Sequence, residues 1–151
     1  MKRILAACLF IFGLTLAAAE NYEASEVNGS IIKAWLDDDF TCKIDEDGDV
    51  FCKNSDTSFY VILDAKRSML CFKSTWSKPD DISVKVLKTM ANEFNRDKIF
   101  VTVSVDEDGD TTVEYFMVYN GGLNRTNFIE SLSWFLTGDS AWSESVKALL
   151  D

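Results

Sequence analysis

Residues 92–123 read NEFNRDKIFVTVSVDEDGDTTVEYFMVYNGGL, and this stretch decides the fold that the sequence predicts. Apolar and polar residues alternate on both sides of the acidic segment Asp106–Asp110, which is the pattern of two strands with one buried face. Gly109 suits the left-handed position of a three-residue bulged turn, because glycine adopts a positive φ at little cost. The stretch therefore predicts a β-hairpin in which Asp106 faces Asp110.

The turn also sets the pairing of the two strands, because the register follows from it by counting. The expected inward pairs are Val103 with Val113, Val101 with Tyr115 and Ile99 with Met117, and the outward pairs are Thr102 with Glu114, Ser104 with Thr112 and Phe100 with Phe116. A slip of one residue would turn every inward apolar side chain outward. The turn and the apolar pattern thus predict the same register independently.

The N-terminal segment has the three parts of a secretory signal peptide. These are the basic pair Lys2-Arg3, the apolar run Ile4–Leu16 and the small-residue cleavage site Ala17–Ala19. We therefore expect residues 1–19 to be removed and residues 20–151 to form one mature domain that is periplasmic or secreted. No later apolar run is long enough to cross a bilayer, so we expect no membrane span after cleavage.

The composition excludes several kinds of site. The chain carries a formal charge of −10, and loss of the first 19 residues, which include two basic and no acidic residues, would change it to −12. Such a surface repels nucleic-acid phosphates and anionic lipid headgroups. It favours solubility, with cationic partners as the alternative. The sequence has no histidine, which excludes a Cys-His or Ser-His nucleophile and removes a usual zinc ligand. We therefore expect no nucleic-acid partner and no cofactor.

The chain before the hairpin predicts two helices and four strands. Helical spacing of apolar residues begins near Val27 and ends by Asp37, and four short strands with tight turns follow over Phe40–Phe72. A second helix is expected after Pro79, with Val86–Phe94 supplying its apolar stripe.

The chain after the hairpin predicts one or two helices. Asn124 is a candidate N-cap, Gly138 is expected to end the helix that it starts, and Ala141–Leu150 is expected to form a short last helix. The summed order is helix, four strands, helix, two strands and one or two helices. This order predicts an α+β fold of two layers, in which an antiparallel sheet carries helices mainly on one face.

Three cysteines remain after residue 19. The turn Asp45–Asp49 has the same sequence as the turn of the central hairpin, and the same geometry would place Cys42 directly opposite Cys52. We take this pair as the disulfide candidate, since disulfides persist in an exported protein. Cys71 would then be a buried apolar thiol, although pairing with Cys42 or Cys52, or with another molecule, stays open.

The two acidic turns raise the question of calcium binding. An EF-hand loop has glycine at its sixth position and a glutamate in register at its end, whereas Gly48 and Gly109 stand fourth. Turn chemistry explains both segments, so we expect no metal site, although a weakly bound calcium ion at the clustered carboxylates stays open. The other acids lie in turns and helix starts rather than in buried positions, which disfavours paired catalytic carboxylates.

Aromatic residues exceed what the predicted inner faces need. Phe100 and Phe116 are expected on the outer side of the hairpin, and Trp134 and Trp142 lie in the C-terminal helical region. If these four side chains are exposed together, they form a candidate partner surface. The alternative is that the last helix, carrying Trp142, covers the two phenylalanines.

Several residues of the second half resemble the bacterial YbjN-domain family. They are Asn95-Arg96 at a helix end, Phe100 in a strand, the acidic turn Asp106–Asp110, the Gly121-Gly122-Leu123 step and Trp134 in the last helix. The resemblance extends over about Val27 to Val146. It implies an α+β fold like that of type III secretion chaperones and the role of a bacterial sensory transduction regulator.

These observations favour an exported, non-enzymatic protein-binding or regulatory module. It would engage a protein partner, or a second copy of itself, through its sheet face or a groove between its helices. A small exported enzyme using carboxylates is one alternative, since the chain has 25 acidic residues. A disulfide-stabilised inhibitor or adaptor is another.

Overall fold

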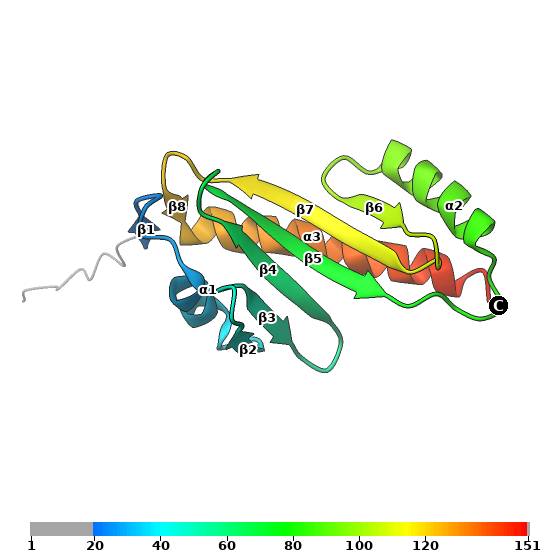
Figure 1. The fold of residues 1–151 in the computed structure, drawn as a ribbon, viewed down its shortest axis with the longest axis horizontal. Coiled ribbons are helices and arrows are strands. Elements are labelled where there is room, and N and C mark those ends of the chain that lie inside the picture. The colour runs from blue at the N-terminus through cyan, green and yellow to red at the C-terminus, as the bar shows by residue number, and fades with distance from the viewer. Residues whose placement is uncertain (1–19, 151) are drawn as a thin grey trace, which may run out of the picture.

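The computed structural model describes residues 20–150, so the expected signal peptide lies outside the described residues. The elements along the chain are β1 (Asn21–Tyr22), α1 (Gly29–Leu36), β2 (Thr41–Ile44), β3 (Val50–Lys53), β4 (Ser58–Asp64), β5 (Met69–Trp76), α2 (Val84–Asp97), β6 (Thr102–Val105), β7 (Thr111–Val118), β8 (Leu123–Asn124) and α3 (Arg125–Lys147). Figure 1 shows their arrangement in space.

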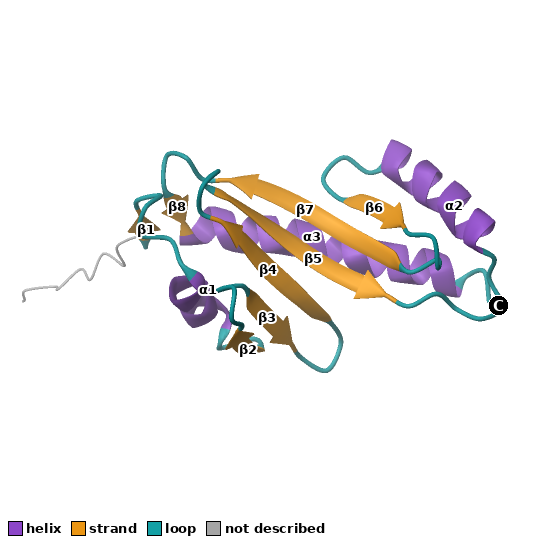
Figure 2. Ribbon diagram, viewed as in Figure 1, coloured by secondary structure: helices purple, strands orange, loops and turns teal. Residues whose placement is uncertain are grey.

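The described chain forms one large antiparallel sheet backed by helices. Its six strands lie in the order β2-β3-β4-β5-β7-β6, and β1 and β8 form a separate small pair. The long helix α3 runs behind the sheet along most of its length, with α1 near one edge and α2 near the other (Figures 1 and 2). The predicted α+β architecture is confirmed. The short β1–β8 pair was not predicted.

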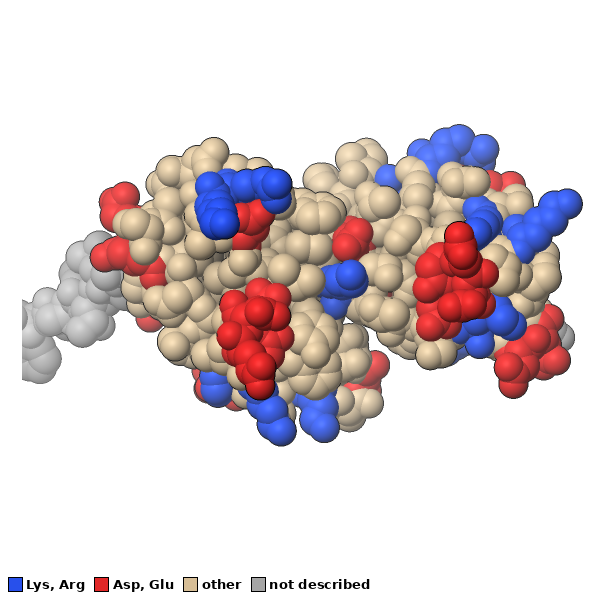
Figure 3. All heavy atoms as spheres, viewed as in Figure 1, with Lys and Arg blue, Asp and Glu red and all other residues tan. Residues whose placement is uncertain are grey.

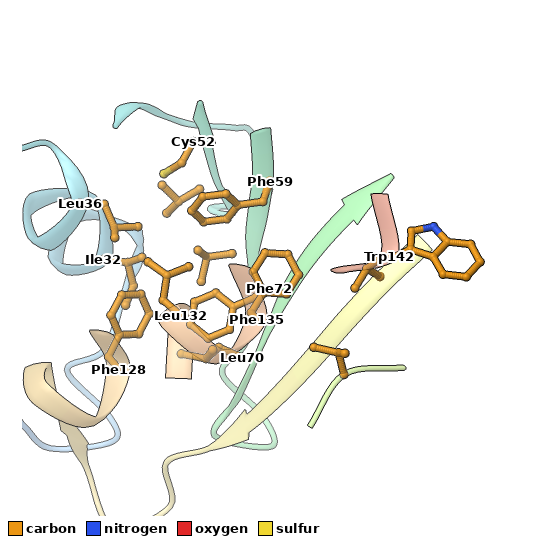
Figure 4. Packing of buried hydrophobic residues seen from close by; sticks show 14 of the residues in the cluster. Ile32, Leu36, Cys52, Phe59, Leu70, Phe72, Phe128, Leu132, Phe135 and Trp142 are labelled. Carbon is orange, nitrogen blue, oxygen red and sulfur yellow. The ribbon is translucent and has the colours of Figure 1, made fainter. Parts of the chain in front are cut away.

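Aromatic and aliphatic side chains together fill the space between the sheet and the helices (Figure 4). Phe72 of β5 lies at the centre, with its ring 5.2 Å from that of Phe128 and 5.7 Å from that of Phe135, both on α3. Phe59 of β4 reaches the same Phe135 ring at 5.7 Å. The ring of Trp35 of α1 lies 5.4 Å from that of Phe128, so these buried rings join α1 and α3 to the sheet.

The predicted turn of the central hairpin is confirmed, together with the register next to it. Val103 pairs with Val113, and the pairs Thr102 with Glu114 and Ser104 with Thr112 also match. Gly109 has a φ of +93°, the left-handed conformation that a bulged turn requires.

The predicted register is wrong before Thr102, where β6 begins. The expected pairs of Ile99 with Met117, Val101 with Tyr115 and Phe100 with Phe116 do not form, and Ile99 is 89% exposed. Val101 is buried and lies against Gly138 of α3. Residues 99–101 therefore lie toward α3 instead of pairing with β7, and pairing with β7 begins only at Thr102.

The two helices expected after the hairpin are one continuous helix, α3, and Gly138 does not end it. A Cβ atom placed on Gly138 would lie 2.6 Å from each Val101 methyl carbon. A glycine near the end of an apolar pattern is typical of a helix terminator, but here Gly138 allows a close approach between helix and loop.

We expect Gly138→Ala to destabilise the protein by about 1–3 kcal/mol, because the new methyl group overlaps the branched side chain of Val101. This cost should exceed the helix-propensity gain of up to about 1 kcal/mol. Chemical denaturation measures the change, and a double-mutant cycle with Val101→Ala should recover part of it. A stabilised Gly138→Ala protein would contradict the close approach.

The structure joins Cys42 of β2 to Cys52 of β3 by a disulfide, and the two residues are direct partners in the strand register. Their Cα atoms are 4.2 Å apart. Both cysteines are buried, and α1 packs on β2 and β3. The bond therefore links the edge strand β2 covalently to β3 in the region that α1 covers.

Replacement of Cys42 and Cys52 by serine should lower the free energy of unfolding by about 3 kcal/mol, since the bond closes a loop of about ten residues in the unfolded chain. Denaturation of the oxidised protein, the reduced protein and the double variant measures the effect. Reduction should not change the stability of the double variant. Equal stability of all three proteins would show that the bond is absent or dispensable.

Candidate protein-interaction surface

No helix of the described chain packs on the other face of the sheet, which we call the open sheet face. In β7, Val113 is buried toward the helices while Phe116 and Val118, which have the opposite parity, are 53% and 61% exposed. Tyr60 of β4 has the same orientation and is partly exposed. Figure 3 shows this face, on which several acidic and basic side chains lie next to one another and much of the remaining surface is uncharged.

Cys71 lies on the open sheet face between two apolar neighbours. The register places it between Ile62 of β4 and Phe116 of β7, and it is buried. Among the described cysteines it is the one with a free thiol. Burial, with a smaller contribution from the negative charge of Glu114, raises the pKa of this thiol to about 11. The thiol therefore stays protonated at neutral pH and packs as an apolar group.

Phe100 and Trp134 form an exposed aromatic cluster on the helix side of the molecule. Their ring centroids are 4.9 Å apart, and the side chains are 51% and 54% exposed. Ile99, which directly precedes Phe100 in the chain, is more exposed than either ring. We call Phe100 and Trp134 the aromatic cluster; together with Ile99 they border a groove of about 260 Å³ between the loop before β6 and α3.

A second and larger groove runs along the other side of α3. It has a volume of about 680 Å³ and lies between the end of α1 and α3, with Phe40, Leu132 and Leu136 among its apolar lining. Thr137 and Ala141 border both grooves, so a ridge of α3 separates them. The prediction that a partner binds in a groove between helices therefore has two candidate grooves.

The four aromatic residues of the predicted partner surface do not lie together. Phe100 and Trp134 meet on the helix side, whereas Phe116 lies on the open sheet face opposite Cys71. Trp142 is 0% exposed and belongs to the core: its Nε1 atom donates to Thr111 Oγ1 at 3.0 Å. The expectation that Trp142 is part of the surface, or covers the two phenylalanines, is therefore wrong.

The acids of the two turns hold the backbone in place. Asp106 Oδ1 accepts hydrogen bonds from the backbone N–H groups of Gly109 and Asp110, and Asp45 serves its own turn in the same way. Asp110 Oδ1 accepts from the backbone N–H of Lys78 at 2.9 Å, which ties the hairpin to the segment before α2. Within residues 20–150, no group of three or more His, Cys, Asp or Glu side chains is arranged to hold a metal ion.

Sequence reasoning missed a buried carboxylate, Asp139 on α3. It is 3% exposed and accepts hydrogen bonds from Ser74 Oγ, from Trp76 Nε1 at 2.8 Å and from Thr57 Oγ1 at 3.4 Å. The signal was present, because Asp139 follows the buried Phe135 by four positions on the same helix face.

Asp139 anchors α3 to β5 and to Thr57, which directly precedes β4, and its oxygen atoms are occupied by protein donors. It borders a pocket of about 350 Å³ that also includes Asp56, but Asp56 is exposed. Within this pocket both oxygen atoms of Asp139 accept hydrogen bonds from protein donors, so the side chain serves as a structural anchor.

The fold is shared with solved structures at low sequence identity. They include YbjN from E. coli (16% identity, TM-score 0.55, covering 78% of this chain and 86% of that chain), an uncharacterized protein from Methanothermobacter thermautotrophicus (16%, 0.60, 83% and 100%) and a chain of the HopA1–SchA chaperone–effector complex (17%, 0.54, 77% and 95%). These likenesses confirm the expected α+β fold of the type III secretion chaperone class.

Residues 30–144 match the family model YbjN, whose description is "Putative bacterial sensory transduction regulator". The chain therefore belongs to the YbjN family, and the resemblance inferred from its motifs is confirmed. No curated protein matches the sequence. Within residues 20–150, no helix has both the length and the apolar character that crossing a membrane requires.

Asp139→Leu should destabilise the protein by about 3 kcal/mol, because it leaves the donors of Ser74 and Trp76 buried without an acceptor. Asp139→Asn keeps one acceptor oxygen and should cost less. Thermal and chemical denaturation of the two variants checks this order. If Asp139→Leu is as stable as the parent protein, the side chain is not an anchor.

Proposed function

We propose that this chain is an exported, non-enzymatic regulatory module that binds a protein partner through the aromatic cluster. The observation that carries the proposal is the pair Phe100 and Trp134, two large rings in contact with each other, each about half exposed beside an apolar groove. Exposed apolar groups of this kind, rimmed by polar residues, mark interaction sites on soluble proteins.

Burial of the two rings would supply a useful part of the binding free energy. Each aromatic side chain contributes roughly 100 Å² of remaining apolar surface, which is worth about 2–3 kcal/mol on burial. Trp is also among the residues that dominate binding energy at interfaces.

The support under the aromatic cluster is firm, which limits the entropy that binding must overcome. Phe100 directly precedes Val101, which is buried against α3, and Trp134 lies one helical turn before Gly138 on the same helix face. The anchors therefore stand on packed elements rather than on a free loop, and little ordering is left for the complex.

The family and the fold support a regulatory, protein-binding role. The family description names a regulator of sensory transduction and no reaction. One chain with the same fold belongs to a chaperone–effector complex, so this architecture serves protein binding in at least that case. The signal-peptide pattern of residues 1–19 supports an activity in the periplasm or outside the cell, and the net negative charge favours a basic partner.

The test compares the chain that begins at Glu20 with the double variant Phe100→Ser/Trp134→Ser in affinity capture from periplasmic extract, followed by titration of each captured protein. We expect the double variant to bind at least tenfold more weakly, because it loses both rings. Leu149→Ser is the matched control, since Leu149 is also about half exposed but lies beyond the end of α3.

Equal binding by the double variant and the parent would move the interaction away from the aromatic cluster. A protein that captures nothing, stays monomeric in light scattering and turns over a member of a substrate panel would overturn the proposed function. A dimer that the double variant abolishes would identify a second copy as the partner.

A further inference from the structure

We propose that the second half of β7, Tyr115–Val118, is an open sheet edge that accepts an extended segment of the partner as an additional strand. The inference rests on the proposed protein-binding function and names the way in which the partner is held.

The edge is open because the neighbouring strand is short. β7 has eight residues and pairs with β5 over its whole length, whereas β6 has four and pairs only as far as Glu114. Within residues 20–150, no strand pairs with the remaining edge of Tyr115–Val118. Figure 1 shows β6 beside only the first half of β7.

The backbone groups that face this edge follow from the hydrogen bonds of β6. The N–H and C=O of Val103 bond to the side-chain amide of Asn95, so they point away from β7, and those of Thr102 point toward Glu114. Alternation along β7 then directs the N–H and C=O groups of Phe116 and Val118 outward as well.

An independent contact gives the same parity. The backbone N–H of Tyr119, an odd-numbered position, donates to Ser68 O at 2.8 Å on the β5 side of the strand. The groups of Tyr115 and Met117 therefore face β5 by alternation. The even-numbered residues face the open edge.

The two terminal strands of the sheet are protected, whereas this edge is not. Asn95 bonds both outward groups of Val103 in β6, and α2 packs beside that strand. β2 is only four residues long and carries the exposed Lys43, a residue type that discourages further pairing. Phe116 and Val118, in contrast, combine free backbone groups with exposed apolar side chains.

Apolar surface flanks the open edge on both faces of the sheet. Phe116 and Val118 lie on the open sheet face, and the loop that carries Phe100 leaves the ladder toward Trp134 on the helix face. An added strand projects its side chains to the two faces in turn. It would therefore place one apolar set on Phe116 and Val118 and the other toward the aromatic cluster, which is how strand addition combines affinity with specificity.

The occupant that fits is an extended peptide segment of neutral or basic charge, with apolar residues at alternate positions. The free run is four residues long and ends where Thr102 of β6 begins, so it has room for a single short strand. A second copy of the chain would bring together two molecules that each carry a net charge of −10 or more, which opposes association.

The test selects random 12-residue peptides, displayed on phage, on the chain that begins at Glu20. Selected peptides should alternate apolar residues and lack excess acid. Val118→Pro should weaken their binding at least tenfold, because proline removes the outward N–H and blocks the edge while leaving the β5 ladder intact. Tyr60→Ser, an exposed position on the same face but away from the edge, is the matched control and should change the affinity less than about twofold.

Residue-resolved amide exchange provides a readout in the unmodified protein. In the free chain the amides of Phe116 and Val118 should exchange quickly and those of Tyr115 and Met117 slowly, and a selected peptide should slow the first pair. Failure to select any alternating peptide, or unchanged binding to a folded Val118→Pro protein, would overturn strand addition. A dimer in light scattering that Val118→Pro dissociates would overturn the peptide as occupant.

The proposed function fails separately from this inference. If the partner captured from extract still binds Val118→Pro but not Phe100→Ser/Trp134→Ser, strand addition is wrong while protein binding through the aromatic cluster stands.

Discussion

The contact between Val101 and Gly138 determines how the second half of the molecule is built. Because Gly138 has no side chain, Val101 packs directly on α3, and the chain enters the sheet only at Thr102. This contact explains why β6 is short. It also leaves the second half of β7 without a neighbour and presents Phe100 at the surface next to Trp134. The surface features that support binding thus follow from one packing constraint in the core.

The parts of the fold that the sequence predicts are those in which local and global preferences agree. The register from Thr102 to Val105 follows from the turn and from the apolar alternation together, and both are properties of neighbouring residues. The same reasoning fails at Ile99, because the competing contact lies about 40 positions away on α3. The prediction for Gly138 fails for the same reason. A glycine within a helical pattern fits either a helix terminator or a close approach, and only the tertiary contact decides between them.

The same distinction explains which candidate site residues could be predicted. Trp134 and Trp142 are eight positions apart, which is about 80° around the helix axis, so their side chains point in different directions. The amino-acid composition does not distinguish between them, because both are tryptophans. Trp142 contacts Phe94 of α2 and is buried, whereas Trp134 contacts Phe100 in the loop that follows α2. Knowing which aromatic ring is exposed requires the position of α2, which no local pattern supplies. Cys42 and Cys52 needed only the geometry of one turn, and that local geometry places them opposite each other.

The residues that carry the family resemblance divide into a scaffold and a surface. Asn95 bonds both backbone groups of Val103, Asp106 holds the hairpin turn, and Leu123 is buried in the core. Each of these has a physical role that the fold requires. Phe100 and Trp134 are different, because about half of each ring faces solvent and the stability of the core does not depend on that exposed half. These two residues from distant parts of the chain contact each other and remain exposed, and the proposed binding of a protein partner rests on them.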